Sequence, residues 1–373
     1  MTRGGVDGGA LGCAPRRMAA DVATRLARGD GLGSGPAASR SAKAGPPPCA
    51  TAARQRTAAA DPVLRLVWLS DVHARPEAKA TEGFARALHC AQSLQPPAEA
   101  ILNGGDCVFD SLKADRDSTL AQWQAFLGVL EANLRIPIYH AIGNHDVWGW
   151  GLSDPSIQSD PLYGKGFALK ELGLDNPYYS FDMGVWHFIV LDSTHPSILA
   201  AGAPRSGIPY TGKLDEDQFT WLTRELNATP SNKPICIVSH IPLFSACGLI
   251  DGPNEASGNW LVPGAWMHID ARRLVSLFHV HPNVRVCLSG HIHEYEHVEF
   301  AGHDGGDSTV CNHSVSYWCN GAVCGGWWKG SYLGFPPALA AISLYSNGTV
   351  DNQFIPYDEV WGDAATASEP PES

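Results

Sequence analysis

Five short segments combine Asp, His and Asn with Gly or Ser, and nearly every one follows a short apolar run. Carboxylate, imidazole and carboxamide groups without a thiolate are ligands that manganese, iron and zinc accept. They outnumber the three or four ligands that one ion usually needs, so the series predicts a site for two metal ions. In chain order the segments are Asp71-Val72-His73, Gly104-Gly105-Asp106, Gly143-Asn144-His145-Asp146, Ser239-His240 and Gly290-His291-Ile292-His293.

Two metal ions held side by side predict hydrolysis of a phosphate ester. Ions about 3.5–4 Å apart and bridged by one carboxylate acidify a shared water and neutralise phosphoryl oxygens during in-line attack. Asp106 stands centrally in the series, and we expect it to be the bridge. Taken alone, an Asp-x-His is usually a turn and a Gly-Asp a helix cap, so the prediction depends on the five segments occurring together.

Apolar runs alternate with stretches of helical periodicity, and this alternation positions the five segments. It predicts an α/β fold in which two sheets pack face to face, helices cover the outer faces, and loops at the carboxyl ends of the strands gather the ligands. Hairpins are expected at 178–191 and at 341–355, around Asn347-Gly348. The expected buried strands are 64–69, 98–102, 136–142, 235–238 and 284–288, and the expected helices are 81–94, 120–134, 214–226 and 269–278.

Composition divides the chain into four parts: a tail at 1–61, a catalytic-type domain at 62–300, a hairpin-rich part at 301–358 that completes the sandwich, and a tail at 359–373. The first tail is rich in Gly, Ala, Pro, Ser and Arg without periodicity, so we expect it to be disordered. Its Arg-rich, acid-poor composition fits an organelle transit peptide, and it lacks the compact apolar region of a secretory signal. A nonfunctional tail or an over-extended start site explains it equally well.

Charge and length exclude some partners. The 373 residues are 44% hydrophobic and carry a net charge of −12, and no apolar stretch has membrane-spanning length, so we expect a soluble, cytoplasmic protein. Residues 1–60 hold nine Lys and Arg against three Asp and Glu, which leaves 17 against 35 for the rest. An acidic body disfavours long nucleic acids, whereas a deep metal site still accepts a small phosphate ester.

The ten cysteines form no Cys-x-x-Cys pair, so we expect most of them to be reduced core residues. Cys311, His313, Cys319 and Cys324 are grouped closely enough to suggest zinc binding or a disulfide, but their spacing matches no standard zinc module.

The five segments match a D-x-H, G-D, G-N-H-[DE], H and G-H-x-H signature, and over about residues 64–300 the chain resembles the calcineurin-like metallophosphoesterase superfamily. The resemblance implies a four-layer α/β/β/α sandwich and attack by a metal-bridging hydroxide. It also implies that His145 protonates the leaving oxygen or stabilises the phosphoryl group, with Asp146 orienting its ring. The implied ligands are Asp71, His73, Asp106 and His293 for one ion, and Asp106, Asn144, His240 and His291 for the other.

Aromatic residues beside these segments are candidates for substrate contacts. Trp148 follows the Gly-Asn-His-Asp turn, and Trp327 and Lys329 lie in a Gly-rich stretch. Trp faces stack on a nucleobase or sugar and Lys pairs with phosphate, although the same residues also brace loops. Together with Asn144 they are the expected substrate-binding residues. The stretches 178–188 and 320–328 resemble the branch that contains cyclic-nucleotide phosphodiesterases and related phosphatases.

The leading hypothesis is hydrolysis of a small phosphodiester or phosphomonoester with two manganese, iron or zinc ions. A protein phosphatase of the same superfamily is the alternative within the enzyme class and needs a shallow, open site. A noncatalytic scaffold stabilised by metal ions is the alternative from another class, and the intact His145-Asp146 pair counts against it. A nuclease is a third alternative, which the acidic body disfavours for duplex substrates.

Overall fold

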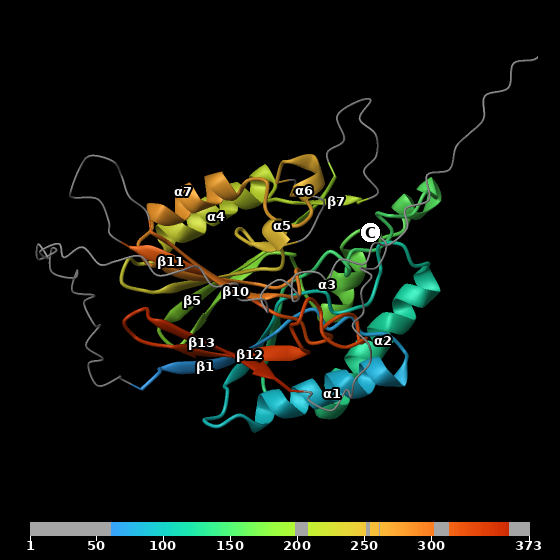
Figure 1. Ribbon diagram of the computed structural model, residues 1–373, viewed down its shortest axis with the longest axis horizontal. Helices are drawn as coiled ribbons and strands as arrows, with labels where there is room; N and C mark the ends of the chain where they lie inside the picture. The colour runs from blue at the N-terminus through green and yellow to red at the C-terminus, as the bar shows by residue number, and fades with distance from the viewer. Residues whose placement is uncertain (1–60, 198–207, 251–253, 261, 302–312, 358–373) are drawn as a thin grey trace, which may run out of the picture. The chain divides into compact units, whose positions relative to one another are not determined.

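The computed structural model describes residues 61–197, 208–250, 254–260, 262–301 and 313–357 (Figure 1). All of them belong to one compact unit within Ala58–Ser373. Residues 1–60 of the expected first tail, the whole expected tail 359–373, and Cys13, Cys49 and Cys311 lie outside the described residues. Within the described ranges, no helix has the length and apolar character needed to cross a membrane.

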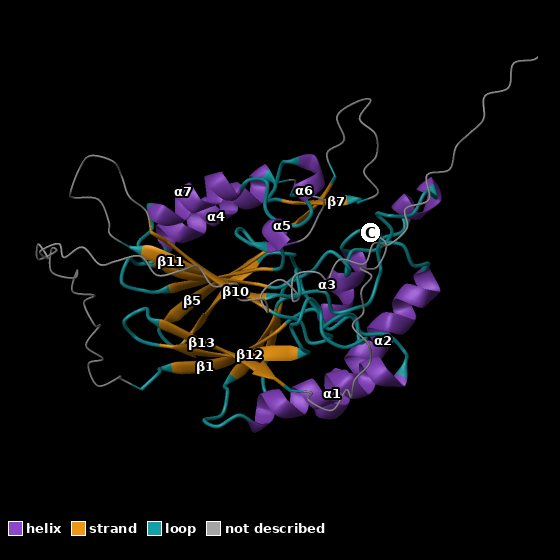
Figure 2. Cartoon of the chain, viewed as in Figure 1, coloured by secondary structure: helices purple, strands orange, loops and turns teal. Residues whose placement is uncertain are grey.

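Two sheets form the centre of the unit (Figure 2). The first has the order β13-β12-β1-β2-β3, the second has the order β10-β11-β9-β8-β5-β4, and β6 and β7 form a separate small hairpin. The strands of the first sheet are β1 (Leu64–Leu69), β2 (Ala100–Asn103), β3 (Ile138–His140), β12 (Ala338–Leu344) and β13 (Val350–Pro356). The other strands are β4 (Tyr179–Met183), β5 (Trp186–Leu191), β6 (Thr194–Pro196), β7 (Tyr210–Gly212), β8 (Ile235–Ser239), β9 (Val284–Ser289), β10 (Tyr295–Ala301) and β11 (Ser314–Asn320).

Helices cover the outer face of each sheet (Figure 1). On the first sheet these are α1 (Ala78–Ser93) and α2 (Arg116–Asn133), and on the second they are α4 (Glu216–Ala228) and α7 (Ala271–His279). Helix α2 begins four residues before the predicted 120–134, because Oδ1 of Asp115 accepts the Ser118 N–H at 2.7 Å and caps it there. The shorter elements are α3 (Gly166–Leu172), the 3₁₀ helix η1 (Pro155–Ser159), α5 (Cys247–Ile250) and α6 (Asn254–Ser257).

The central strands β1, β2, β5, β8 and β9 are buried on both faces, and alternate side chains therefore enter different cores. In β1, Leu66 and Trp68 point between the sheets, where they join Phe188 of β5 in one buried cluster. Val67 and Leu69 point the other way and pack with residues of α1 and α2. A third cluster lies between the second sheet and the helices α4 and α7. Three cores between four layers confirm the predicted α/β/β/α sandwich.

The carboxyl-terminal strands belong to both sheets: β12 and β13 to the first, and β10 and β11 to the second. Strand β12 pairs antiparallel with β1, with Leu66 opposite Ile342, while β11 lies parallel to β9. Strands β10, β11, β6 and β7 were not among the predicted elements. The ends of β1, β2, β8 and β9 all lead into the predicted ligand segments, because each strand stops one to three residues before a predicted ligand.

Candidate metal centre

The loops that follow parallel strands bring the predicted ligands to one place. Strand β1 lies parallel to β2, and β8 lies parallel to β9, so their carboxyl ends point the same way within each sheet. Asp71 follows β1, Asp106 follows β2, and His240 and His291 follow β8 and β9. Each of the seven predicted ligands lies beside at least one other, at the distances given next.

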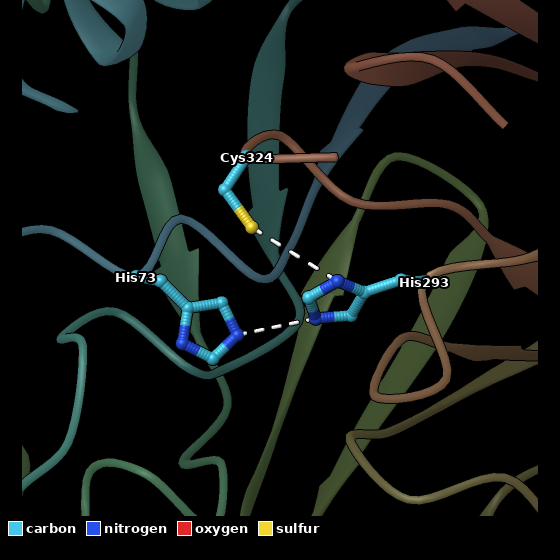
Figure 3. Close-up of side chains that lie close together, drawn as sticks. All are labelled: His73, His293 and Cys324. Atoms are coloured by element: carbon cyan, nitrogen blue, oxygen red, sulfur yellow. Dashed lines mark hydrogen bonds between the residues drawn. The ribbon is translucent and has the colours of Figure 1, made fainter. Parts of the chain in front are cut away.

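On one side of the centre, two imidazole rings face one another. Nε2 of His73 lies 3.2 Å from Nε2 of His293 (Figure 3). The same Nε2 of His293 lies 3.5 Å from Oδ1 of Asp71. The thiol of Cys324 points toward the other side of the His293 ring, with Sγ 4.0 Å from Nδ1. These side chains come from segments more than 200 residues apart, since His73 and His293 differ by 220 positions.

On the other side, His240 is the central residue. Its Nε2 lies 3.0 Å from Oδ1 of Asn144 and 3.3 Å from Oδ2 of Asp106, and its ring is 5.1 Å from that of His291. The same Oδ2 of Asp106 lies 3.7 Å from Nε2 of His73. Asp106 therefore lies between the two groups of imidazoles.

Backbone carbonyls orient each imidazole through its second nitrogen, as occurs around protein metal sites. Nδ1 of His240 contacts the carbonyl of Gly104 at 2.8 Å, and Nδ1 of His293 contacts that of Gly325 at 2.6 Å. Nε2 of His291 instead contacts the Ala265 carbonyl at 2.8 Å. These contacts leave Nε2 of His240 and His293, and Nδ1 of His291, to face the centre.

The backbone at the centre is strained. Five of the predicted ligands have a positive φ, which costs a non-glycine residue about 1–2 kcal/mol: Asp71 (55°), His73 (47°), Asp106 (52°), His291 (76°) and His293 (57°). Strain of this kind persists where the surrounding structure enforces it and is concentrated at functional sites. A Cβ at Gly143 would lie 2.1 Å from Oδ1 of Asp106, and one at Gly290 would lie 2.4 Å from Oδ2 of Asp71. Both glycines are needed because the carboxylates lie directly against the backbone.

Buried opposite charges hold the carboxylates ionised. Burial alone raises a carboxyl pKa, but His293 and His240 outweigh it and lower the pKa of Asp71 to about 2. At Asp106 burial is likewise outweighed, mainly by His240 and His145, so its pKa lies well below 3.8. Burial lowers the pKa of an imidazole, yet Asp106 raises the pKa of His240 to about 9. The centre therefore attracts positive charge.

The residues fit a pair of cations. Asp71 and Asp106 are 0% and 1% exposed, so their negative charges need compensation that water cannot supply. Nε2 of His73 faces Nε2 of His293 across 3.2 Å while the Nδ1 atoms of both rings contact backbone carbonyls, so a cation would find two imidazole nitrogens together here. The Nδ2 group of Asn144 is buried without a hydrogen-bond partner in the described structure. The donor set contains nitrogen and oxygen, which suits manganese, iron or zinc.

The sequence pattern of the family described as calcineurin-like phosphoesterase matches residues 64–295, more than half of the chain. The chain belongs to this family. A manganese-dependent ADP-ribose/CDP-alcohol diphosphatase of Arabidopsis thaliana is 27% identical over an alignment of 227 residues that covers 52% of the chain and 64% of that relative, less than two thirds of its length. A 3′,5′-cyclic-nucleotide phosphodiesterase of Nostoc sp. is 22% identical over 274 residues, 72% of the chain and 80% of that relative.

A solved structure shares the fold of this calcineurin-like phosphoesterase. The dimetal phosphatase from Danio rerio has a TM-score of 0.51 and 16% sequence identity, over 80% of this chain and 100% of that one. Similarity at this level of identity supports the same layered architecture. It agrees with the four layers and the three cores described above.

The expected contact between Asp146 and the ring of His145 is corrected by the structure of this phosphoesterase. Nδ1 of His145 donates instead to the carbonyl of Phe109 at 2.7 Å. The Asp146 carboxylate accepts three backbone N–H groups, from Cys107 (2.8 Å), Val108 (3.2 Å) and Gly143 (2.9 Å). Burial and the nearby charge of Asp106 raise the pKa of Asp146 to about 7. Asp146 joins two ligand loops, and the Phe109 carbonyl orients the imidazole.

The expected substrate-binding residues separate into buried and accessible ones. Trp148 is only 2% exposed, its Nε1 donates to the Ala114 carbonyl at 3.1 Å, and its ring packs on Phe167. The expectation that Trp148 contacts substrate is therefore wrong, because its ring fills the core and braces the loop. Trp327 is half-buried beside the ring of His293, and Lys329 is exposed.

Two aromatic residues near the centre were not predicted from the sequence. The ring of Tyr210, in β7, lies 6.2 Å from that of His291. The ring of Tyr332 lies 5.8 Å from that of His293. Neither adjoins a ligand segment, and the only available signal was the aromatic content of two Gly- and Pro-containing stretches.

The cysteines are largely as predicted. Seven described cysteines are free, and all except Cys90 are buried. Of the residues considered for a second zinc site, Cys311 lies outside the described residues, while Cys324 lies against His293 and His313 lies 5.8 Å from the ring of His279. Among the described residues, the groups that could hold a metal ion include Cys324, together with His73 and His293, but neither Cys319 nor His313.

Proposed function

We propose that this protein is a phosphoesterase that depends on two metal ions and hydrolyses a small phosphodiester or phosphomonoester. The observation that supports this most directly is the position of Asp106, whose Oδ2 lies 3.3 Å from Nε2 of His240 and 3.7 Å from Nε2 of His73. One carboxylate between two imidazole groups is the arrangement that a bridged pair of ions requires.

The described residues divide naturally into two ligand sets that share Asp106. When bound, the two ions would acidify a water and neutralise the phosphoryl oxygens. Manganese fits the donor set and also appears in the name of the Arabidopsis relative. We infer that one ion is held by Asp71, His73, Asp106 and His293, and the other by Asp106, Asn144, His240 and His291.

Side-chain nitrogens that do not bind the ions are available to contact the substrate. His145 donates to Phe109 through Nδ1, so in the imidazolium form the Nε2–H is the group that can give a proton to the leaving oxygen or a hydrogen bond to the phosphoryl group. The amide N–H of His145 donates to Oδ1 of Asp106 at 2.8 Å, which ties the imidazole to the shared carboxylate. The unpartnered Nδ2 of Asn144 is a second donor for a phosphoryl oxygen.

A nucleotide-derived ester is the substrate class that the relatives favour. The two relatives are named for ADP-ribose or CDP-alcohols and for cyclic nucleotides. Both classes are small phosphate esters, which suits an acidic protein whose charge disfavours long nucleic acids. Diphosphate cleavage and diester cleavage use the same attack at phosphorus.

Hydrolysis of bis-p-nitrophenyl phosphate and p-nitrophenyl phosphate tests the proposal. The protein is stripped with a chelator and then reloaded with manganese, iron or zinc, beside an Asp106→Asn variant. We expect turnover that needs added metal and is lost in the variant. Two ions bound per chain without turnover of either ester, of ADP-ribose or of a cyclic nucleotide would leave the scaffold hypothesis as the better one.

A further inference from the structure

We propose that the aromatic pair Trp327 and Tyr332 receives the planar base of a nucleotide ester, and that the buried Trp328 holds this pair beside the metal centre. The inference rests on the proposed phosphoesterase function and names what chooses its substrate. None of the three residues belongs to the ligand segments.

Trp327 lies directly beside one half of the centre. Its ring centroid is 4.4 Å from that of His293 with an interplanar angle of 31°, and 5.9 Å from that of His73. Tyr332 meets Trp327 edge-on at 5.4 Å with an angle of 85°, and it also lies 5.8 Å from His293. The pair thus forms an aromatic surface next to the His73 and His293 ligands.

The neighbouring Trp328 is fixed in the core. It is 3% exposed, and its Nε1 donates to the backbone carbonyl of His73 at 3.1 Å. The Trp328 ring lies against Gly83 of α1, where an added Cβ would come within 2.2 Å of it. A buried indole that bonds the backbone of a predicted ligand ties this loop to the centre.

The backbone between the two indoles is unusual. Trp327 and Trp328 have φ values of 50° and 65°, a left-handed conformation that bulky residues seldom adopt. This conformation sends the two successive indoles into different surroundings. Trp328 is buried, whereas Trp327 is half-buried and lies beside the centre. A tertiary contact of Trp328 therefore determines where the aromatic surface of Trp327 lies.

The chemistry of this surface fits a nucleobase. Bases stack on aromatic side chains, and losing one such contact weakens binding by roughly 10- to 100-fold. The Trp327 and Tyr332 rings carry no charge and lie beside the proposed metal centre, so they suit a planar group linked to phosphorus through a sugar. The exposed Lys329 next to it is available for a second phosphate of a diphosphate substrate.

Two esters with the same leaving group test the inference. Thymidine 5′-(p-nitrophenyl) phosphate and methyl p-nitrophenyl phosphate both release p-nitrophenol, but only the first carries a base. The measured quantity is the ratio of their kcat/KM values with the manganese-loaded protein. We expect the parent protein to favour the nucleoside ester, and the Trp327→Ala variant to lower the ratio about 10- to 100-fold. Trp327→Phe should retain most of the preference, because it keeps a stacking face.

Gly83→Val tests the positioning role of Trp328 by changing the residue of α1 against which its ring packs. The added side chain must displace the Trp328 ring, and we expect the ratio to fall although no predicted ligand, nor Trp327 or Tyr332, has been substituted. Trp221→Ala is the matched control for Trp327→Ala, since Trp221 is also half-buried and packs on an aromatic ring, that of Tyr178 at 4.8 Å, but belongs to α4. The control should keep the parent ratio.

The outcomes separate this inference from the proposed function. If the parent protein cleaves neither ester with any metal, the proposed function fails. If it cleaves both and Trp327→Ala lowers both values equally, the function stands and the base-stacking inference is overturned. An unchanged ratio in Gly83→Val, with normal folding by circular dichroism, overturns the role of Trp328 alone.

Discussion

The backbone carbonyl of Phe109 accepts a 2.7 Å hydrogen bond from Nδ1 of His145. The same carbonyl lies 3.4 Å from Nδ1 of His73, so one peptide group orients a predicted ligand and the proposed proton donor together. The position of the donor relative to the centre therefore depends on the loop after β2, and the ring does not need a carboxylate partner.

Replacing His145 with Gln should lower kcat by about two to four orders of magnitude, because the variant cannot donate a proton in the transition state. Manganese content, measured by inductively coupled plasma mass spectrometry, should remain at two ions per chain. Turnover within a factor of two of the parent value would show that His145 plays no part in the reaction.

Replacing Asp146 with Ala should lower the free energy of unfolding by about 2–4 kcal/mol, since three buried backbone N–H groups lose their acceptor. Urea denaturation of the metal-free protein measures this value. Asp117→Ala is the control, because Asp117 is exposed in the first turn of α2 and its loss should lower the value by less than about 1 kcal/mol. Equal stabilities of the two variants would refute the structural role of Asp146.

Replacing Gly143 with Ala should displace Asp106, because the new Cβ would lie 2.1 Å from Oδ1 and 2.3 Å from the backbone nitrogen of that residue. We expect fewer than two manganese ions per chain and at least about a hundredfold loss of turnover, because a displaced Asp106 cannot bridge two ions in the geometry that the reaction needs.

Gly128→Ala is the matched control for that variant. Gly128 is exposed within α2 and a Cβ there would meet no atom within 4 Å, so the change should stabilise the helix by up to about 1 kcal/mol. Full metal content in both variants would contradict the close packing at Gly143.

The stabilising contribution of Asp270 should depend on pH. Burial alone would raise its pKa, but the hydrogen bond and charge of His268 and the Leu214 N–H outweigh burial, so its pKa is lowered from 3.8. A lowered folded-state pKa means that the stabilisation is present above the unfolded-state pKa and is lost as pH falls through the folded-state pKa.

The metal-free parent and the Asp270→Asn variant provide the comparison. The difference in their unfolding free energies should be about 1–2 kcal/mol above roughly pH 5 and shrink below that pH. A difference that grows on acidification would show that ionised Asp270 does not stabilise the fold.

Local features of the sequence determined which residues are predicted as ligands and most of the framework. Each ligand segment follows its own strand, and apolar runs such as 64–69 and 284–288 agree closely with β1 and β9. These signals are local, because strand burial and loop composition are properties of a few consecutive residues. The same reasoning predicted the four layers.

Only the tertiary structure decided which groups meet around those ligands. Phe109, not Asp146, orients His145, and Trp148 fills the core while Trp327 lies beside the centre. Such choices depend on contacts between distant segments, as between Trp328 and the carbonyl of His73, which are 255 positions apart. A local pattern specifies a side chain and its strand, but the neighbours of that side chain are set by how whole layers pack.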